Sequence, residues 1–115
     1  MKPQEAIRRA VEAHPYCPHC GATSGLQTHH RANRGMGGSP KRLMDRFDNL
    51  LRVCAKLNYE MESNSAVASE ARDMGWKLGQ WDSYSHPYFD RVAMQWYELT
   101  EDGRKLPTHP PTYLI

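Results

Sequence analysis

Apolar and polar positions along the first half of the chain predict a short helix followed by two strands. Apolar residues recur at helical spacing after Pro3, a residue tolerated in a first helical turn, so residues 3–13 are expected to form an amphipathic helix. The stretches 26–30 (Leu-Gln-Thr-His-His) and 49–54 (Asn-Leu-Leu-Arg-Val-Cys) have compositions typical of short strands. The two histidines therefore stand at the end of the first predicted strand.

The second half of the chain predicts another helix and then strands. Apolar residues at helical spacing indicate a helix over residues 58–74, and Gly75 is suited to cap its C-terminus. Residues 92–99, followed by a Glu-Asp-Gly turn at 101–103, predict a β-hairpin or two short strands. The proline-rich tail, 107–115, is expected to be extended or loosely packed.

These elements indicate one small α+β domain. The chain has 115 residues, with a core expected over about 16–75 and an extension over 76–115 whose aromatic residues are expected to pack in the interior. No apolar run reaches the length needed to cross a bilayer, and the chain does not open with a signal-peptide pattern. Three cysteines are an odd number, which argues against a secreted disulfide framework. We therefore expect a soluble, cytoplasmic protein whose thiols are free to bind metal.

Charge is distributed unevenly along the sequence. The whole chain carries a formal charge of only +2. Residues 31–56 carry seven basic and two acidic residues, whereas 60–103 carry nine acidic and three basic residues. The middle stretch is therefore a candidate surface for nucleic-acid phosphate, although most charge runs are simply solvated.

The cysteines have the spacing of a metal site. Cys17 and Cys20 are separated by two residues and followed by a glycine, an arrangement in which both thiolates of a turn can bind one tetrahedral ion. Cys54 supplies a third thiolate if the two predicted strands pair as a hairpin. The alternative is that all three are buried thiols that act as small apolar residues.

The order of these motifs resembles the HNH endonuclease family, particularly its short bacteriophage-type members. The resemblance runs from about residue 16 to 75 and rests on one ordered series: Cys-x-x-Cys-Gly, His-His, Gly-Gly, Asp-Asn-Leu-Leu and Cys. It implies a ββα-metal fold, in which two strands and a helix surround one catalytic divalent ion. It also implies a separate zinc bound by cysteines.

The resemblance assigns separate roles to the paired histidines. His29 matches the family's metal ligand and His30 its general base, and neighbouring strand residues point in opposite directions. Asn49 matches the middle asparagine, which braces the loop that orients the base. As an isolated feature, Asn49 could instead simply form a turn.

The second half of the motif departs from the commonest pattern. Asn58 stands where the family's last histidine is found, as in the HNN variant, and its amide oxygen suits a hard ion such as Mg²⁺ or Mn²⁺ better than Zn²⁺, with Ni²⁺ a further possible cofactor. Glu62 lies one helical turn later and is a further possible ligand. Both residues are equally compatible with an ordinary helix start.

A second departure affects the structural zinc. Leu57 occupies the position of a fourth cysteine in relatives that have two cysteine pairs. Either His14 or His19 completes the site, or zinc is weak or absent and packing by Leu57 replaces it. The sequence leaves both alternatives open.

The function implied by the resemblance is hydrolysis of DNA phosphodiester bonds. His30 would activate water, the ion would stabilise the phosphate, and the products would carry 5′-phosphate and 3′-hydroxyl ends. Arg31 and Arg34 directly follow the base and are candidate phosphate ligands. By analogy, such a protein works on phage DNA in the cytoplasm of a bacterial host, beside terminase proteins.

A different class of function is compatible with the same residues. Leu57 and Asn58 depart from the commoner pattern, so the chain could be a non-catalytic zinc module that binds DNA or a partner protein. In that case, replacing His30 would leave its function intact.

Overall fold

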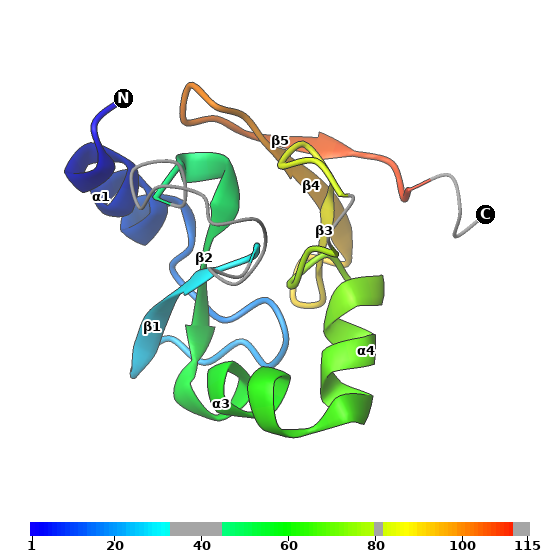
Figure 1. Ribbon diagram of the computed structural model, residues 1–115. Helices are drawn as coiled ribbons and strands as arrows, with labels where there is room; N and C mark the ends of the chain where they lie inside the picture. The colour runs from blue at the N-terminus through cyan, green and yellow to red at the C-terminus, as the bar shows by residue number, and fades with distance from the viewer. Residues whose placement is uncertain (33–44, 80–81, 112–115) are drawn as a thin grey trace.

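The N-terminal half of the protein is a helix and a two-stranded hairpin (Figure 1). The computed structural model describes residues 1–32, 45–79 and 82–111. Helix α1 (Pro3–Ala13) and strand β1 (Leu26–His30) form where they were predicted. Strand β2 (Leu50–Cys54) follows a short 3-10 turn, η1 (Phe47–Asn49), and therefore begins one residue later than predicted. The strands pair antiparallel, so that Cys54 lies opposite Leu26, at the start of β1.

The predicted helix over 58–74 is two helices, and in this respect the prediction is wrong. Helix α3 (Ala55–Ser63) begins directly after β2, and helix α4 (Ser65–Asp73) begins after Asn64. The Asn64 side chain accepts hydrogen bonds from the backbone N–H groups of the next helix and caps it, which favours a new helix over continuation of the first. Gly75, with φ of +74°, follows the end of α4 as predicted.

The C-terminal part forms a three-stranded antiparallel sheet. Its strands are β3 (Tyr88–Asp90), β4 (Gln95–Leu99) and β5 (Lys105–Thr108), in that spatial order. The predicted hairpin is confirmed as β4–β5, and β3 adds a third strand. The tail, predicted to be extended or loosely packed from residue 107, is extended as far as Thr108, and Pro107 pairs with Tyr97. Strand β5 lies at the sheet edge, where a proline is tolerated.

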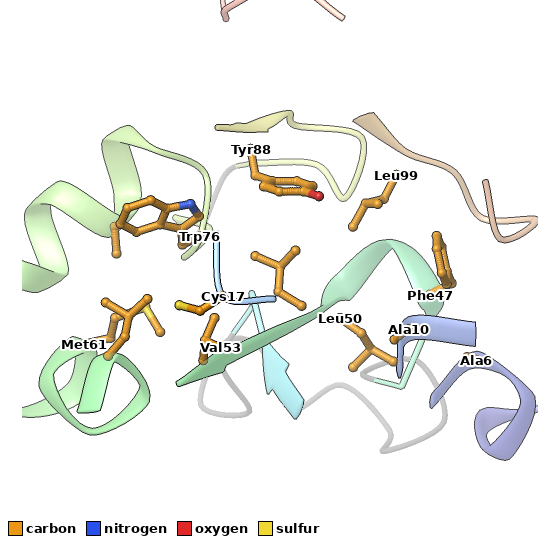
Figure 2. Packing of buried hydrophobic residues seen from close by; sticks show 13 residues of the cluster. Ala6, Ala10, Cys17, Phe47, Leu50, Val53, Met61, Trp76, Tyr88 and Leu99 are labelled. Carbon is orange, nitrogen blue, oxygen red and sulfur yellow. The ribbon is translucent and has the colours of Figure 1, made fainter. Parts of the chain in front are cut away.

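One apolar core joins the helices and the hairpin to strands β3 and β4 (Figure 2). It includes Ala6 and Ala10 of α1, the apolar residues of β2, Met61 of α3, and Trp76, Tyr88 and Leu99 from the C-terminal part. Figure 2 shows Tyr88 and Leu99 on one side of this cluster and the α1 alanines near Leu50 and Phe47. The protein is a small α+β structure with two antiparallel sheets. None of the helices in the described ranges is long and apolar enough to cross a membrane.

Candidate metal centre and polar site

The three cysteines gather at one point of the fold. Cys17 and Cys20 come from the turn before β1, and Cys54 ends β2 directly before α3. Their Sγ atoms all lie within 4.8 Å of one another, with Cys17 buried and Cys20 exposed. The predicted gathering of the three thiol groups is confirmed, and the cluster could hold a metal ion such as zinc.

The thiols differ in their surroundings. Burial raises the pKa of the Cys17 thiol. The backbone N–H of Ala22 lowers the pKa of the Cys20 thiol. The Sγ of Cys54, at the N-cap of α3, accepts a hydrogen bond from the Leu57 N–H at 3.4 Å. Each contact to an N–H stabilises a thiolate, the form that binds metal.

Neither histidine considered as a fourth ligand joins the cysteines. All the histidine, cysteine, aspartate and glutamate residues of the chain lie in the described ranges, and the group holds only the three cysteines. The His19 ring packs edge-on against Trp76, with ring centroids 5.3 Å apart, and its Nε2 lies 3.8 Å from Glu70. The His14 ring contacts Phe47 and Tyr88 in the core. The alternative in which His14 or His19 completes the cysteine site is therefore not seen in this structure.

His30 forms a pair with a buried carboxylate. Its Nε2 lies 2.6 Å from Oδ1 of Asp45, whose side chain is 6% exposed, whereas the imidazole itself is 38% exposed. An ionised carboxylate can only accept a hydrogen bond, so the Nε2–H donates. In the neutral imidazole the unprotonated nitrogen is then Nδ1.

His29 points to the other side of β1 and is buried. Its Nε2 lies 2.7 Å from the Trp76 carbonyl oxygen, and burial lowers its pKa to about 4. Because a carbonyl only accepts, the Nε2–H donates and the lone pair resides on Nδ1. Metal-binding histidines commonly donate their second ring N–H to a carbonyl in this way.

The other two predicted metal ligands have different partners. Nδ2 of Asn58 donates to Oε1 of Gln27 at 2.7 Å, and Gln27 lies two residues before His29, on the same face of β1. Glu62 forms an ion pair of 3.1 Å with Lys77, one residue after Trp76. The structure thus places Asn58 on the His29 side of the hairpin but gives no direct contact between them. Their role as metal ligands stays a prediction.

Asn49 lies at the junction of the two strands. It is fully buried, and its Oδ1 accepts a hydrogen bond of 2.7 Å from the Ala32 N–H, while its backbone oxygen accepts one from the Arg31 N–H. These bonds fix the chain directly after His30. An effect of Asn49 on the orientation of His30 is compatible with this position and stays a prediction.

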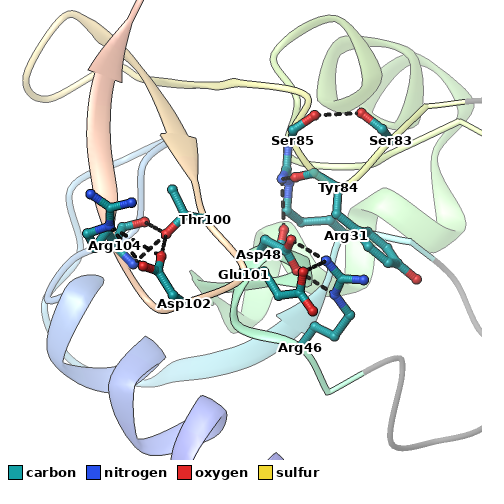
Figure 3. A network of polar contacts seen from close by, with 10 residues as sticks. All are labelled: Arg31, Arg46, Asp48, Ser83, Tyr84, Ser85, Thr100, Glu101, Asp102 and Arg104. Atoms are coloured by element: carbon teal, nitrogen blue, oxygen red, sulfur yellow. Dashed lines mark hydrogen bonds and ion pairs between the residues drawn. The ribbon is translucent and has the colours of Figure 1, made fainter. Parts of the chain in front are cut away.

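Arg31 is buried, which disfavours the contact with phosphate that the sequence predicted for it, and that contact stays a prediction. Its side chain is fully buried, and its N–H groups donate to four backbone carbonyls, those of Asp48, Gly75, Tyr84 and His86. Burial lowers its pKa to about 10, so the guanidinium stays charged at neutral pH. Figure 3 shows Arg31 beside Tyr84 and Asp48. The buried charge ties β1 to η1 and to the segment before β3.

The remaining basic residues of 31–56 have varied surroundings. Arg34, the second predicted DNA ligand, lies outside the described residues. Arg46 makes two hydrogen bonds to Asp48, and its guanidinium lies 4.6 Å from the centroid of the Tyr84 ring (Figure 3). Arg52 donates to the Thr28 hydroxyl, and neither it nor the exposed Lys56 forms an ion pair with a carboxylate of the described chain. Arg52 and Lys56 are therefore better candidates for phosphate contacts than Arg31.

Asp45 is not among the site residues that the sequence predicted. It stands in the Asp-Arg-Phe-Asp-Asn stretch, where Asp48 and Asn49 drew attention because they belong to the motif. Acidic residues are rare in the basic stretch 31–56, which contains only Asp45 and Asp48. That rarity is the one signal by which a carboxylate partner for His30 could have been sought.

No protein-family model, curated protein or solved structure matches this chain. The candidate site is defined by two local arrangements of the structure itself. One is the group of three cysteines that could hold a metal ion, and the other is His30 paired with a buried carboxylate.

Proposed function

We propose that the protein is a metal-dependent endonuclease that hydrolyses DNA phosphodiester bonds, with His30 as the general base. The observation that carries the proposal is the 2.6 Å hydrogen bond between His30 and buried Asp45. A carboxylate that fixes the tautomer of a partly exposed imidazole is typical of a base that takes a proton from water. The sequence resemblance to HNH endonucleases supports the same role for His30.

In this proposal the chain's own residues position and accept one proton. Asp45 holds the Nε2–H, so Nδ1 of His30 takes the proton of the attacking water. The water oxygen forms the new bond to phosphorus while the bond from phosphorus to the 3′ oxygen breaks, and the leaving 3′ oxygen takes a proton from solvent. The products carry 5′-phosphate and 3′-hydroxyl ends.

His29 and Asn58 are the residues that would hold a divalent ion such as Mg²⁺ or Mn²⁺. The unprotonated Nδ1 of His29 and the amide oxygen of Asn58, on one side of the hairpin, are donor types that suit such an ion. When bound, the ion supplies Lewis-acid stabilisation of charge on the phosphate oxygens. Glu62 would join only by leaving its ion pair with Lys77.

The test is cleavage of supercoiled plasmid by the purified protein with Mg²⁺, Mn²⁺, Ni²⁺ or Zn²⁺. We expect His30→Ala to lower the cleavage rate about 10²- to 10⁴-fold, the usual contribution of a general base. The matched control is His109→Ala, which removes an exposed imidazole from the C-terminal segment. Intact plasmid with every ion, or equal rates for both variants, would refute the proposal.

Asp45 has a separate test as a positioning residue. Asp45→Asn keeps the shape of the side chain but removes the carboxylate, and we expect kcat to fall about 10- to 100-fold with little change in KM. Asp102→Asn, at a fully exposed carboxyl group, is the matched control. A change in KM alone would indicate a role in DNA binding instead.

The cysteine cluster favours a second candidate, a non-catalytic zinc module. The three thiols could hold a Zn²⁺ that ties the turn before β1 to the start of α3. In that case DNA or protein binding would depend on Cys17, Cys20 and Cys54 and be unaffected by His30→Ala. The two candidates therefore differ in one variant, and the plasmid experiment separates them. A link to phage DNA packaging or terminase proteins stays a prediction from resemblance.

A further inference from the structure

The three-cysteine cluster presents fewer ligands than a closed structural zinc site needs. Structural zinc is almost always tetrahedral, with four protein ligands, whereas sites with three protein ligands hold water or another molecule in the fourth position. The three Sγ atoms lie within 4.8 Å of one another. The histidines, aspartates and glutamates of the chain, all within the described ranges, do not join them.

Position 57 explains the missing ligand. Cys54-Ala-Lys-Leu57 has the same spacing as Cys17-Pro-His-Cys20, but it ends in leucine. Leu57 lies in the first turn of α3, and its backbone N–H donates to the Sγ of Cys54. Its side chain is 3% exposed and packs in the apolar core. Leu57, at the spacing of a fourth ligand, therefore offers no ligand atom. It contributes only a backbone hydrogen bond to the Sγ of Cys54, which is already one of the three ligands.

One side of the cluster is open to solvent. Cys20 is exposed and Cys54 is half-buried, whereas Cys17 lies in the core. His19, between the two cysteines of the turn, is directed to the Trp76 ring and to Glu70. An ion held by the three sulfurs would therefore be reached from the Cys20 side.

We propose that zinc bound by Cys17, Cys20 and Cys54 keeps a fourth coordination position that exchanges with solvent and accepts a small thiolate. Thiolates are the ligand class that a zinc ion already bound by three sulfurs takes most readily, and water occupies the position otherwise. One water leaves the metal as one thiolate arrives, and the proton of the incoming thiol is released to the buffer. The inference rests on zinc binding at the cysteines, but not on nuclease activity.

The test uses full-length protein loaded with Co²⁺, whose absorption reports the number of bound thiolates. Under anaerobic conditions with a phosphine reductant, a small monothiol is titrated into the protein. We expect the sulfur-to-cobalt charge-transfer absorption to rise by about one third, as three thiolates become four. Leu57→Cys supplies the fourth sulfur from the chain, so this variant should begin at the higher absorption and show no further rise.

The matched control is Leu57→Ala, which shortens the side chain without adding a thiol and should respond like the wild type. Absence of cobalt–thiolate bands in the wild type, or bands that do not respond to thiol, would overturn the inference. The wild-type titration decides the matter even if a Leu57 variant fails to fold. Plasmid cleavage is scored separately on the same preparation, so a failure here and a failure of the proposed nuclease function are distinguishable.

Discussion

Buried His14 should make the protein lose stability in mild acid. Its ring packs against Phe47 and Tyr88, it bonds to the Leu50 backbone, and its Nε2 is buried without a hydrogen-bond partner in the described residues. Burial, helped by the positive charges of Lys105, Arg31 and Arg52, lowers its pKa from 6.5 to about 3. The folded protein therefore resists a proton that the unfolded chain accepts.

The sign and size follow from these two pKa values. Above pH 6.5 the imidazole is neutral in both states and contributes no pH dependence. As the pH falls from 6.5 towards 3, only the unfolded state binds the proton, and the free energy of unfolding falls by about 1.4 kcal/mol per pH unit. At pH 5 the loss is about 2 kcal/mol, a large part of the roughly 5–15 kcal/mol that stabilises a domain.

The assay is urea unfolding, followed by tryptophan fluorescence, at pH 7.5 and pH 5.0. His14→Asn keeps a donor near the position of Nδ1 and cannot titrate, so its loss between the two pH values should be about 2 kcal/mol smaller than that of the wild type. Release of metal from the cysteines also varies with pH, but it affects both proteins and cancels in the difference. His109→Asn, at an exposed site, should behave like the wild type.

An equal loss in His14→Asn and the wild type would refute the reasoning. It would mean that the imidazole can take a proton in the folded protein, and therefore that it does not lie in the enclosed, positively charged surroundings described for it.

Three further substitutions test the framework by urea unfolding. Arg31→Met should lower the free energy of unfolding by about 3 kcal/mol or more, because it leaves buried carbonyls unpaired. Weaker DNA binding with unchanged stability would instead indicate that Arg31 contacts phosphate. Gly75→Ala should lower the free energy of unfolding by more than about 3 kcal/mol, because φ is +74° and a Cβ would lie 2.0 Å from the Pro87 oxygen. A soluble variant of wild-type stability would contradict this geometry. Asn64→Ala should cost about 1 kcal/mol through loss of the α4 cap, and no change would show that the cap is dispensable.

The sequence predicted those features that depend on local pattern. Proline at the start of α1 and alternating composition in β1 determine local backbone preferences, and these elements have the predicted bounds. The gathering of the cysteines also followed from local information, because pairing two short strands necessarily brings Cys54 opposite the start of β1. Asn64 can either cap a new helix or continue the preceding one. Apolar periodicity alone does not predict which of the two occurs.

Features that depend on distant partners could not be predicted in this way. Arg31 follows two candidate site residues and is of a residue type that commonly binds phosphate. Its partners, however, lie between 17 and 55 residues away in the sequence. They are backbone carbonyls, which carry no side-chain signal in a sequence. The Asp45 partner of His30 is likewise 15 residues distant and joins it through a segment without periodicity.

These distant contacts give the C-terminal extension a role in the candidate site. On β1 and directly after it, His29 donates to the Trp76 carbonyl, Arg31 donates to the Gly75 carbonyl, and the Arg31 backbone oxygen accepts from the Leu78 N–H. The segment after α4 thus runs along the end of β1, and Trp76 continues into the core and donates its indole N–H to the Phe89 carbonyl of β3. Because the Trp76 carbonyl fixes which nitrogen of His29 carries the proton, the sheet that holds Trp76 in place also determines that the lone pair of this imidazole resides on Nδ1.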